Sequence, residues 1–325
     1  MTLAILYKLL AIVLTVALGY AAGRMRWLGD ERQGADPART LSAAAFYIFI
    51  PALLFRTTAR LDLATLPWHT LAAFFVPLLA TLLAVYAWQR QRPHASAAAP
   101  TVRAFTLTFG NTVQVGIPVA TALFGEAGLG IHITIVSLHA LVLLTAATAL
   151  VELDLAHARA RDAGVTPALW PTLRSTLRQT IVHPVVLPVL AGMAWSAFGI
   201  PMPAMVDEVL LLLGSAVVPL CLVLIGLSLA YYGLAGRVRS ALAITLAKLL
   251  LLPALALAVA HWGFGLAGQP LAVVVMAAAL PVGSNPLIFA QRYAALEAET
   301  TAAIVLSTLG FVVTAPLWLW VLGWL

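Results

Sequence analysis

The feature that most limits how this chain folds is a series of apolar runs, each about as long as a lipid bilayer is thick. A helix that crosses the hydrocarbon core needs about 20 consecutive apolar residues. We find ten such runs, at residues 2–23, 40–59, 67–89, 101–125, 131–152, 181–200, 207–230, 240–262, 270–290 and 299–322. Hydrophobic residues make up 62% of the 325 positions and charged residues only 9%, which is more apolar surface than a soluble domain of this size buries. The sequence therefore predicts an all-α polytopic membrane protein with ten transmembrane helices.

A polar segment at residues 153–180 divides the ten runs into five and five. We therefore expect a first five-helix repeat at 1–152, a cytoplasmic connector, and a second five-helix repeat at 181–325. Because each repeat has an odd number of spans, the second inserts upside down relative to the first. Mid-span prolines support the repeat, since equivalent prolines are separated by the same number of positions. These pairs are Pro51 with Pro219, and Pro118 with Pro286.

Basic residues concentrate in the loops that follow the odd-numbered spans. Because cytoplasmic loops carry an excess of Lys and Arg, we expect these loops in the cytoplasm and both termini on the extracytoplasmic side of the cell membrane. The first apolar run is interpreted as a retained span and not as a signal peptide. The net charge of +6 indicates contact with anionic lipid headgroups of the bilayer and no nucleic-acid partner. Cys221 is the only cysteine, which excludes an internal disulfide.

Two polar, helix-breaking motifs interrupt the fourth and ninth runs: GNTVQVGIP at 110–118 and PVGSNP at 281–286. Proline removes a backbone donor, and a membrane helix tolerates this where the opened backbone is buried or faces a polar cavity. We expect the two breaks to cross near the bilayer midplane and to present helix N-termini to an anion. The alternative is that they only kink two packed helices. The candidate substrate-binding residues are Asn111, Thr112, Gln114, Gly116, Gly283, Ser284 and Asn285, and the crossover is assigned to Pro118, Pro286, Pro51 and Pro219.

These motifs resemble those of the auxin efflux carrier family of secondary transporters, which includes the plant PIN-FORMED carriers and bacterial organic-acid permeases. The resemblance extends over nearly the whole chain. It is carried by GNTVQVGIPVATALFG (110–125), ALPVGSNPLIFAQRY (279–293), PALLF (51–55) and VPLCLVLIGLSLA (218–230). It implies two inverted five-helix repeats with crossed broken helices 4 and 9, as in the bile-acid and sodium–proton transporters.

The resemblance also implies that spans 1, 2, 6 and 7 form a scaffold and that spans 3, 4, 5, 8, 9 and 10 form a moving transport domain. The implied substrate is an organic anion with a carboxylate, with auxin-like indole acids among the candidates. This sequence departs from the family at His183-Pro184, where Asn-Pro is common, and at Gln114, where an apolar residue is common. Both departures bear on which substrate is bound.

Several charged or titratable residues are further candidates. Lys248 lies deep in the eighth run, where a charge is costly and usually faces a cavity or a partner. Lys248 either balances the anion or replaces a coupling cation. The alternative is that it snorkels toward the membrane interface or makes a structural bond to a broken-helix carbonyl. His183 borders the cavity of the family and is a candidate substrate ligand, whereas His132 and His139 fit helix packing better than proton transfer. Arg56 either contacts substrate or anchors the interface.

The preferred function is a secondary transporter that moves a small organic anion by an elevator-type movement of the transport domain. The alternatives are a channel or ligand sensor on the same fold, and a sodium- or proton-coupled organic-acid symporter. The sequence has no His-Glu-x-x-His, Gly-x-Ser-x-Gly or Walker motif, so no enzyme activity, metal or cofactor is expected. A homodimer through the scaffold is left open.

Overall fold

The computed structural model describes residues 3–29, 37–60, 67–93, 96–162, 182, 184, 186–232 and 238–324. Within these ranges the chain is helical apart from turns and short connections, and an isolated antiparallel bridge joins Gly110 to Val282. The all-α class predicted from the sequence is confirmed for this part of the chain.

The helices before the predicted connector are α1 (Leu3–Arg24), α2 (Pro37–Ala44), η2 (Ala45–Phe49), α3 (Ile50–Ala59), α4 (Trp68–Arg90), α5 (Ala99–Thr108), η3 (Thr112–Gly116) and α6 (Ile117–Asp162), where η denotes a π-helix. Those after it are α8 (Val186–Ala197), α9 (Ala204–Tyr232), α10 (Val238–Leu246), η4 (Ala247–Leu251), α11 (Leu252–Ala258), η5 (Val259–Gly263), α12 (Gly268–Ala279), α13 (Asn285–Arg292) and α14 (Glu297–Leu322).

Six segments among the described residues are long and apolar enough to cross a membrane. They are Pro37–Ala59, Trp68–Arg90, Leu123–Arg161, Ala204–Tyr231, Val238–Gly263 and Glu297–Leu322. Two further apolar helices, Leu187–Ala197 and Gly268–Ala279, are shorter. These segments agree with a polytopic membrane protein, and the number of ten spans stays a prediction. The fourth and ninth runs fall short of a full crossing helix because each is interrupted.

The predicted division between spans 4 and 5 is a kink at which two helices meet inside the segment labelled α6. α6 is assigned from Ile117 to Asp162, with a non-helical kink at Gly125, where φ is 62°. Its C-terminal end extends ten residues beyond the predicted end of span 5 at residue 152, into the predicted connector. The rest of that connector, residues 163–180, lies outside the described residues, as does His183.

Prolines follow three of the four described π-helical turns, and η5 (Val259–Gly263) is the exception. η2 ends two residues before Pro51, η3 two residues before Pro118, and η4 two residues before Pro253. Proline has no N–H, and its ring clashes with the carbonyl of the preceding turn. The turn therefore widens, and the Ile50 amide donates to the Ala45 carbonyl, five residues earlier. Pro51 and Pro219 lie within helical segments that continue through them.

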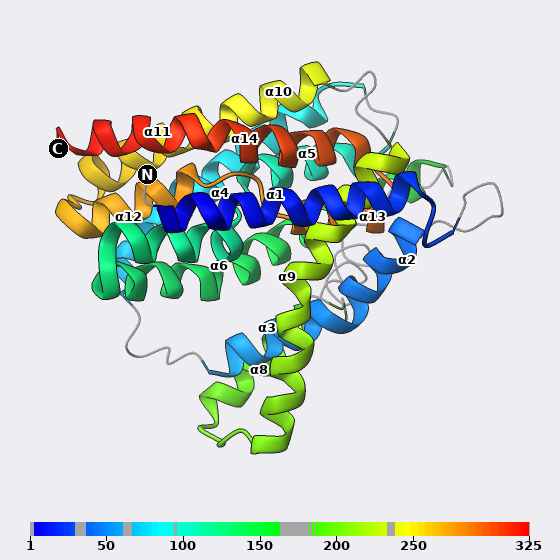
Figure 1. Cartoon of the computed structure of the whole chain (residues 1–325), viewed down its shortest axis with the longest axis horizontal. Coiled ribbons are helices and arrows are strands. Elements are labelled where there is room, and N and C mark those ends of the chain that lie inside the picture. Colours follow the sequence, from blue (N-terminus) through cyan, green and yellow to red (C-terminus); the bar gives the residue numbers. More distant parts are fainter. Residues whose placement is uncertain are drawn as a thin grey trace.

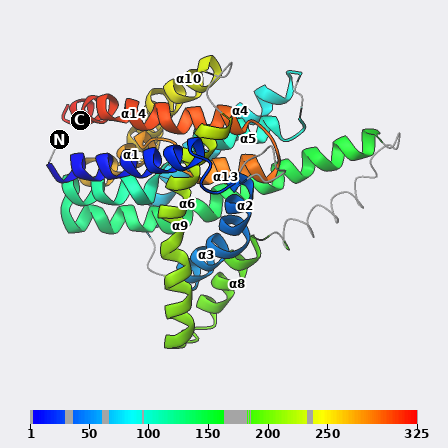
Figure 2. The same ribbon diagram turned by 45° about the vertical axis from the view of Figure 1, so that its right-hand side comes forward.

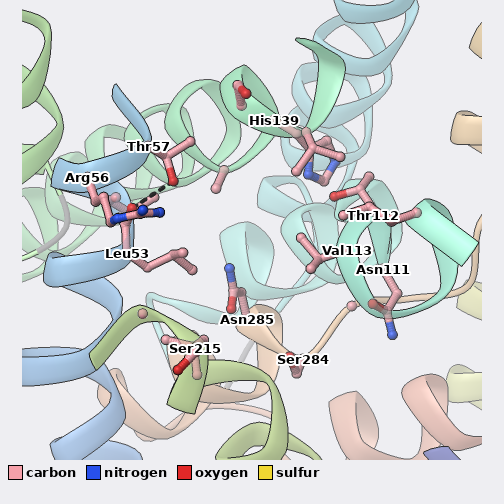
Figure 3. Close-up of a pocket in the computed structure, with 18 of the residues that line it drawn as sticks. Leu53, Arg56, Thr57, Asn111, Thr112, Val113, His139, Ser215, Ser284 and Asn285 are labelled. Atoms are coloured by element: carbon pink, nitrogen blue, oxygen red, sulfur yellow. Dashed lines mark hydrogen bonds between the residues drawn. The ribbon is translucent and has the colours of Figure 1, made fainter. Parts of the chain in front are cut away.

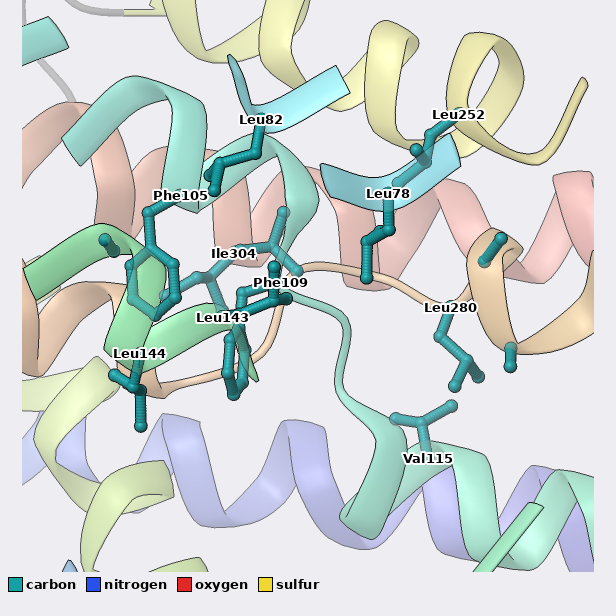
Figure 4. Packing of buried hydrophobic residues seen from close by; sticks show 14 of the residues in the cluster. Leu78, Leu82, Phe105, Phe109, Val115, Leu143, Leu144, Leu252, Leu280 and Ile304 are labelled. Carbon is teal, nitrogen blue, oxygen red and sulfur yellow. The ribbon is translucent and has the colours of Figure 1, made fainter. Parts of the chain in front are cut away.

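The helices pack into two contacting groups. α9 lies against α1 and α3, and α3 also contacts α8. α8, α3 and the first half of α9 extend away from the remaining helices (Figures 1 and 2). α4, α5, α6, α12 and α14 pack around a buried apolar cluster that includes Phe105, Leu143 and Leu280 (Figure 4).

Candidate functional site

The two predicted helix breaks lie side by side and pair with each other. α5 ends at Thr108 and η3 begins at Thr112, while α12 ends at Ala279 and α13 begins at Asn285. The Asn111 amide donates to the Pro281 carbonyl at 2.8 Å, and the Gly283 amide donates to the Phe109 carbonyl at 3.0 Å. Backbone groups that each broken helix leaves open are thus satisfied by the other, as hydrocarbon surroundings require.

Two glycines at the breaks are required by close approach. A Cβ on Gly283 would lie 2.9 Å from the Gly110 carbonyl oxygen and 2.9 Å from a ring carbon of Phe109. A Cβ on Gly116 would lie 2.5 Å from His132 Nε2, which is 2.8 Å from the Thr112 carbonyl oxygen. Both positions therefore contribute to the site by letting the backbone pack tightly.

A cavity of about 520 Å³ lies next to the paired breaks (Figure 3). One wall comes from the breaks, a second from α6, and the opposite wall from the C-terminal half of α3 and the N-terminal half of α9. Asn285 reaches the centre of the view between Arg56 and Thr112, while Asn111 lies at the far wall. The polar side chains that line the cavity are Arg56, Thr57, Asn111, Thr112, Ser137, His139, Ser215, Ser284 and Asn285.

The N-terminal and C-terminal ends of the four half-helices at the breaks have different surroundings. Residues of the N-terminal ends, Thr112 and Val113 on η3 and Asn285 on α13, line the cavity. The first amides of a helix have no partner within the helix and carry a partial positive charge. The cavity therefore presents helix N-termini and neutral polar side chains to whatever occupies it, an arrangement suited to an anion.

The C-terminal ends of α5 and α12 meet a buried lysine. Lys248, on η4, is 1% exposed. Its ammonium donates to the Ala278 carbonyl at 3.2 Å and lies 3.5 Å from the Thr108 carbonyl. These carbonyls end the two half-helices and carry partial negative charge. The bond to a broken-helix carbonyl, one of the sequence alternatives, is therefore present, and whether Lys248 also balances an anion or replaces a coupling cation stays a prediction.

Two histidines lie behind the breaks. His139 is 1% exposed, lines the cavity, and its Nε2 lies 3.5 Å from the Gly110 amide. Its ring packs against Phe109, with a centroid distance of 4.5 Å. His132 bonds the Thr112 carbonyl and supports η3 from the other side. Both histidines are buried packing residues, and His139 also forms part of the cavity wall.

Arg56 places a cation at the cavity wall opposite the breaks. Its Nε and Nη2 donate to the two Asp207 carboxylate oxygens at 2.9 and 3.3 Å, which joins α3 to α9. Arg60 binds the same carboxylate but does not line the cavity. Arg56 thus both joins α3 to α9 and faces the cavity.

The structure brings most of the predicted residues together and leaves some apart. Asn111, Thr112, Gly283, Ser284 and Asn285 line the cavity. Pro51 and Pro219 belong to flanking helices and not to the paired breaks, and the side chains of Gln114 and Pro118 lie outside the described residues. Sequence reasoning did not identify Leu53, Thr57, Ser137 and Ser215 as cavity residues. They lie in apolar runs whose pattern does not indicate which face meets the cavity.

The paired breaks and the adjoining cavity fit a carrier, and the family comparison agrees. A family model described as "Membrane transport protein", which represents the auxin efflux carriers, matches residues 4–319. The chain belongs to this family. The uncharacterized transporter YfdV of Escherichia coli K12 is 27% identical to this membrane transport protein over 319 residues, covering 96% of each chain. YfdV proteins of Escherichia coli O157:H7 and Shigella flexneri match to the same extent.

The predicted resemblance to the auxin efflux carriers is thereby confirmed. The family is one of transporters and not of enzymes. Among the described residues of this membrane transport protein, no group of three His, Cys, Asp or Glu side chains is placed to hold a metal ion.

Proposed function

We propose that this protein is a secondary transporter of small organic anions and that the substrate carboxylate binds in the cavity at the paired breaks. One observation carries the proposal: the cavity is lined by the N-terminal ends of two half-helices together with Thr112, Ser284 and Asn285. Such ends favour negative charge, and broken helices of this kind form the substrate sites of many transporters. Auxin-like indole acids and small aliphatic carboxylates are both within the proposed range.

The proposed mechanism is an elevator. α1, α2–α3, α8 and α9 correspond to the scaffold, and the remaining helices correspond to the transport domain, in two inverted repeats of five spans. The cavity lies between the two groups, with Arg56 and Ser215 on the scaffold side and Asn285 on the transport side. Movement of the breaks along α3 and α9 would carry the bound anion across the membrane, with both chain termini on the extracytoplasmic side.

Energy for the movement would come from the membrane potential or from a solute gradient. One anion leaving a cell with a potential of 100 mV gains about 2.3 kcal/mol, which corresponds to a gradient of about 50-fold. The arrangement therefore supports export without nucleotide hydrolysis. A dimer through the scaffold stays a prediction.

The test begins with a thermal-shift screen of the purified protein against a library of carboxylates. A compound that raises the melting temperature is then used for binding and for flux into proteoliposomes. Asn285→Asp keeps the shape of the side chain but adds a negative charge, so we expect at least 10-fold weaker binding. Thr112→Val removes a hydroxyl from the cavity wall and should weaken binding less. Thr134→Val, on an exposed face of α6 outside the cavity, is the matched control.

Counterflow distinguishes a carrier from the other functions. A carrier accelerates uptake of labelled substrate when unlabelled substrate is present inside the vesicle. A channel gives flux without this acceleration, and a ligand sensor gives binding without flux. Either result, or unchanged binding in Asn285→Asp, would reject the proposed function.

A further inference from the structure

The Lys248 ammonium lies where two negative helix ends converge. Its two carbonyl contacts, at 3.2 and 3.5 Å, come from α12 and α5, which are the halves of different broken helices. Gly110 lies in the break between α5 and η3, and a Cβ at this position would lie 3.4 Å from Lys248 Nζ. Lys248 therefore bonds to both broken helices at their point of contact.

The Lys248 ammonium supplies positive charge beside the carbonyl ends of α5 and α12. Within the described part of the chain, no carboxylate forms an ion pair with Lys248, and the ammonium contacts the Thr108 and Ala278 carbonyl oxygens. His139, on α6, reaches the same break through the Gly110 amide, and Ser307, on α14, accepts from the Val282 amide. The carbonyl ends of the half-helices therefore rely on Lys248 for their counter-charge.

Converging carbonyls from broken helices are the ligands that a small monovalent cation takes in coupled transporters. A lysine ammonium is a compact cation with three donors and suits the same oxygen atoms. The ammonium is also permanently tethered, so its local concentration does not depend on the solution. A bound cation would have to enter and leave with each cycle.

We propose that the Lys248 ammonium is a built-in replacement for a dissolved coupling cation, so that the paired breaks keep their binding geometry without sodium or potassium. The inference rests on the proposed anion site, because it assigns how the charge of that site is balanced. It also makes a claim about the empty protein, which can be measured with no substrate present.

The experiment compares wild type with Lys248→Ala, Lys248→Met and Lys248→Arg in buffers of sodium, potassium, choline or ethylammonium chloride. The first readout is the melting temperature without substrate. Wild type should melt at the same temperature in all four salts. Lys248→Ala opens a space beside the carbonyls, so sodium or ethylammonium should raise its melting temperature by about 2 °C or more over choline. Lys248→Met fills the space with an apolar chain and should show no such rise.

The second readout is binding of a carboxylate found in the thermal-shift screen. Wild type should bind equally, within about twofold, in sodium and in choline. Lys248→Ala should bind at least 10-fold more weakly in choline and regain affinity in sodium or ethylammonium, while Lys248→Arg should remain independent of the salt. Lys248→Met should stay weak in every salt.

The outcomes separate this inference from the proposed function. If wild type needs sodium for stability or binding, or if Lys248→Ala responds to no cation, Lys248 does not replace one. Wild-type affinity in Lys248→Met would overturn the inference as well. If no carboxylate binds wild type, the proposed function fails, but the melting temperatures of the empty variants still decide the role of Lys248.

Discussion

The Asn111 amide donates a hydrogen bond to the Pro281 carbonyl over 2.8 Å, although 170 positions separate the two residues in the chain. This bond, with the one from the Gly283 amide to Phe109, makes the two broken helices a single paired unit. The proposed anion site at the N-terminal ends and the Lys248 ammonium at the C-terminal ends are therefore joined through the same paired backbone. In the proposed elevator movement, we expect the two paired breaks to move together.

Gly283→Ala should disrupt this unit. The added methyl group would lie 2.9 Å from the Gly110 carbonyl oxygen, and the backbone cannot move aside without losing a bond between the breaks. Overpacking of this kind costs about 1–3 kcal/mol. We expect a lower melting temperature and a loss of substrate binding, measured by thermal unfolding and by equilibrium binding.

Gly130→Ala is the matched control for Gly283→Ala. No atom lies within 4 Å of a Cβ at Gly130, and the residue lies in a helix, where alanine is favourable. It should bind and unfold like wild type. If Gly283→Ala and Gly130→Ala had the same melting temperature and substrate affinity, the close approach at Gly283 would not be needed for stability or binding.

Arg56→Gln should raise the KM for an anionic substrate about 10-fold and change kcat less, because Arg56 brings positive charge to the cavity wall. Arg60→Gln is the comparison, since Arg60 pairs with the same Asp207 carboxylate from outside the cavity. Flux into proteoliposomes at varied substrate concentration gives both constants. If the two variants raise KM equally, Arg56 acts only through the ion pair with Asp207.

The helix breaks could be predicted from the sequence because glycine, proline and asparagine act on the backbone locally, wherever they occur. Asn111, Ser284 and Asn285 were recognised as cavity residues for that reason. The length of α6 was underestimated because apolar character ends near residue 152, whereas helix-forming Ala, Leu and Arg continue to Asp162. Hydropathy predicts where lipid is met, and it does not fix where a helix ends.

Long-range charge pairs could not be predicted. Arg103 and Glu299 are 196 positions apart, and Arg56 and Asp207 are 151 apart. From the local sequence alone, each of these four residues is expected to be a solvated charge at the end of its own span. Their pairing depends on which helices become neighbours, and that depends on packing of the whole chain.

Glu299→Gln should destabilise the protein strongly. Glu299 is 1% exposed and accepts hydrogen bonds from Arg103 at 2.6 and 3.0 Å and from Ser240 at 2.9 Å. Breaking a buried pair by removing one charge costs about 3–5 kcal/mol. The melting midpoint should fall by several degrees, and Arg103→Met with Glu299→Leu together should recover part of the loss. Glu126→Gln, at an exposed position of α6, should melt like wild type, and a wild-type midpoint for Glu299→Gln would contradict the role of the pair.

The proposed scaffold and the proposed transport domain also touch at a second place, near the N-terminal ends of α2 and α14 and away from the cavity. Arg39 on α2 pairs with Glu297 on α14 at 2.9 Å, and the Arg292 guanidinium lies 5.3 Å from the Tyr47 ring centroid. The cavity, by contrast, adjoins residues 53–57 of the same scaffold segment. In the proposed elevator, we therefore expect the two contacts to stabilise the arrangement in which the cavity forms at the other end of α2–α3.

Charge reversal tests this contact. An exposed ion pair is worth about 0.2–1 kcal/mol, so Arg39→Glu should shift the ratio of the two proposed transport states by about 1.5- to 5-fold. Ser215→Cys in the cavity reports that ratio through its rate of modification by a membrane-impermeant thiol reagent, because the native Cys221 is 1% exposed. Modification should slow in Arg39→Glu and return toward the starting rate when Glu297→Arg is added. The effect should shrink at 1 M salt, where exposed charges are screened. A double variant that behaves like Arg39→Glu alone would show that the two side chains do not act as a pair.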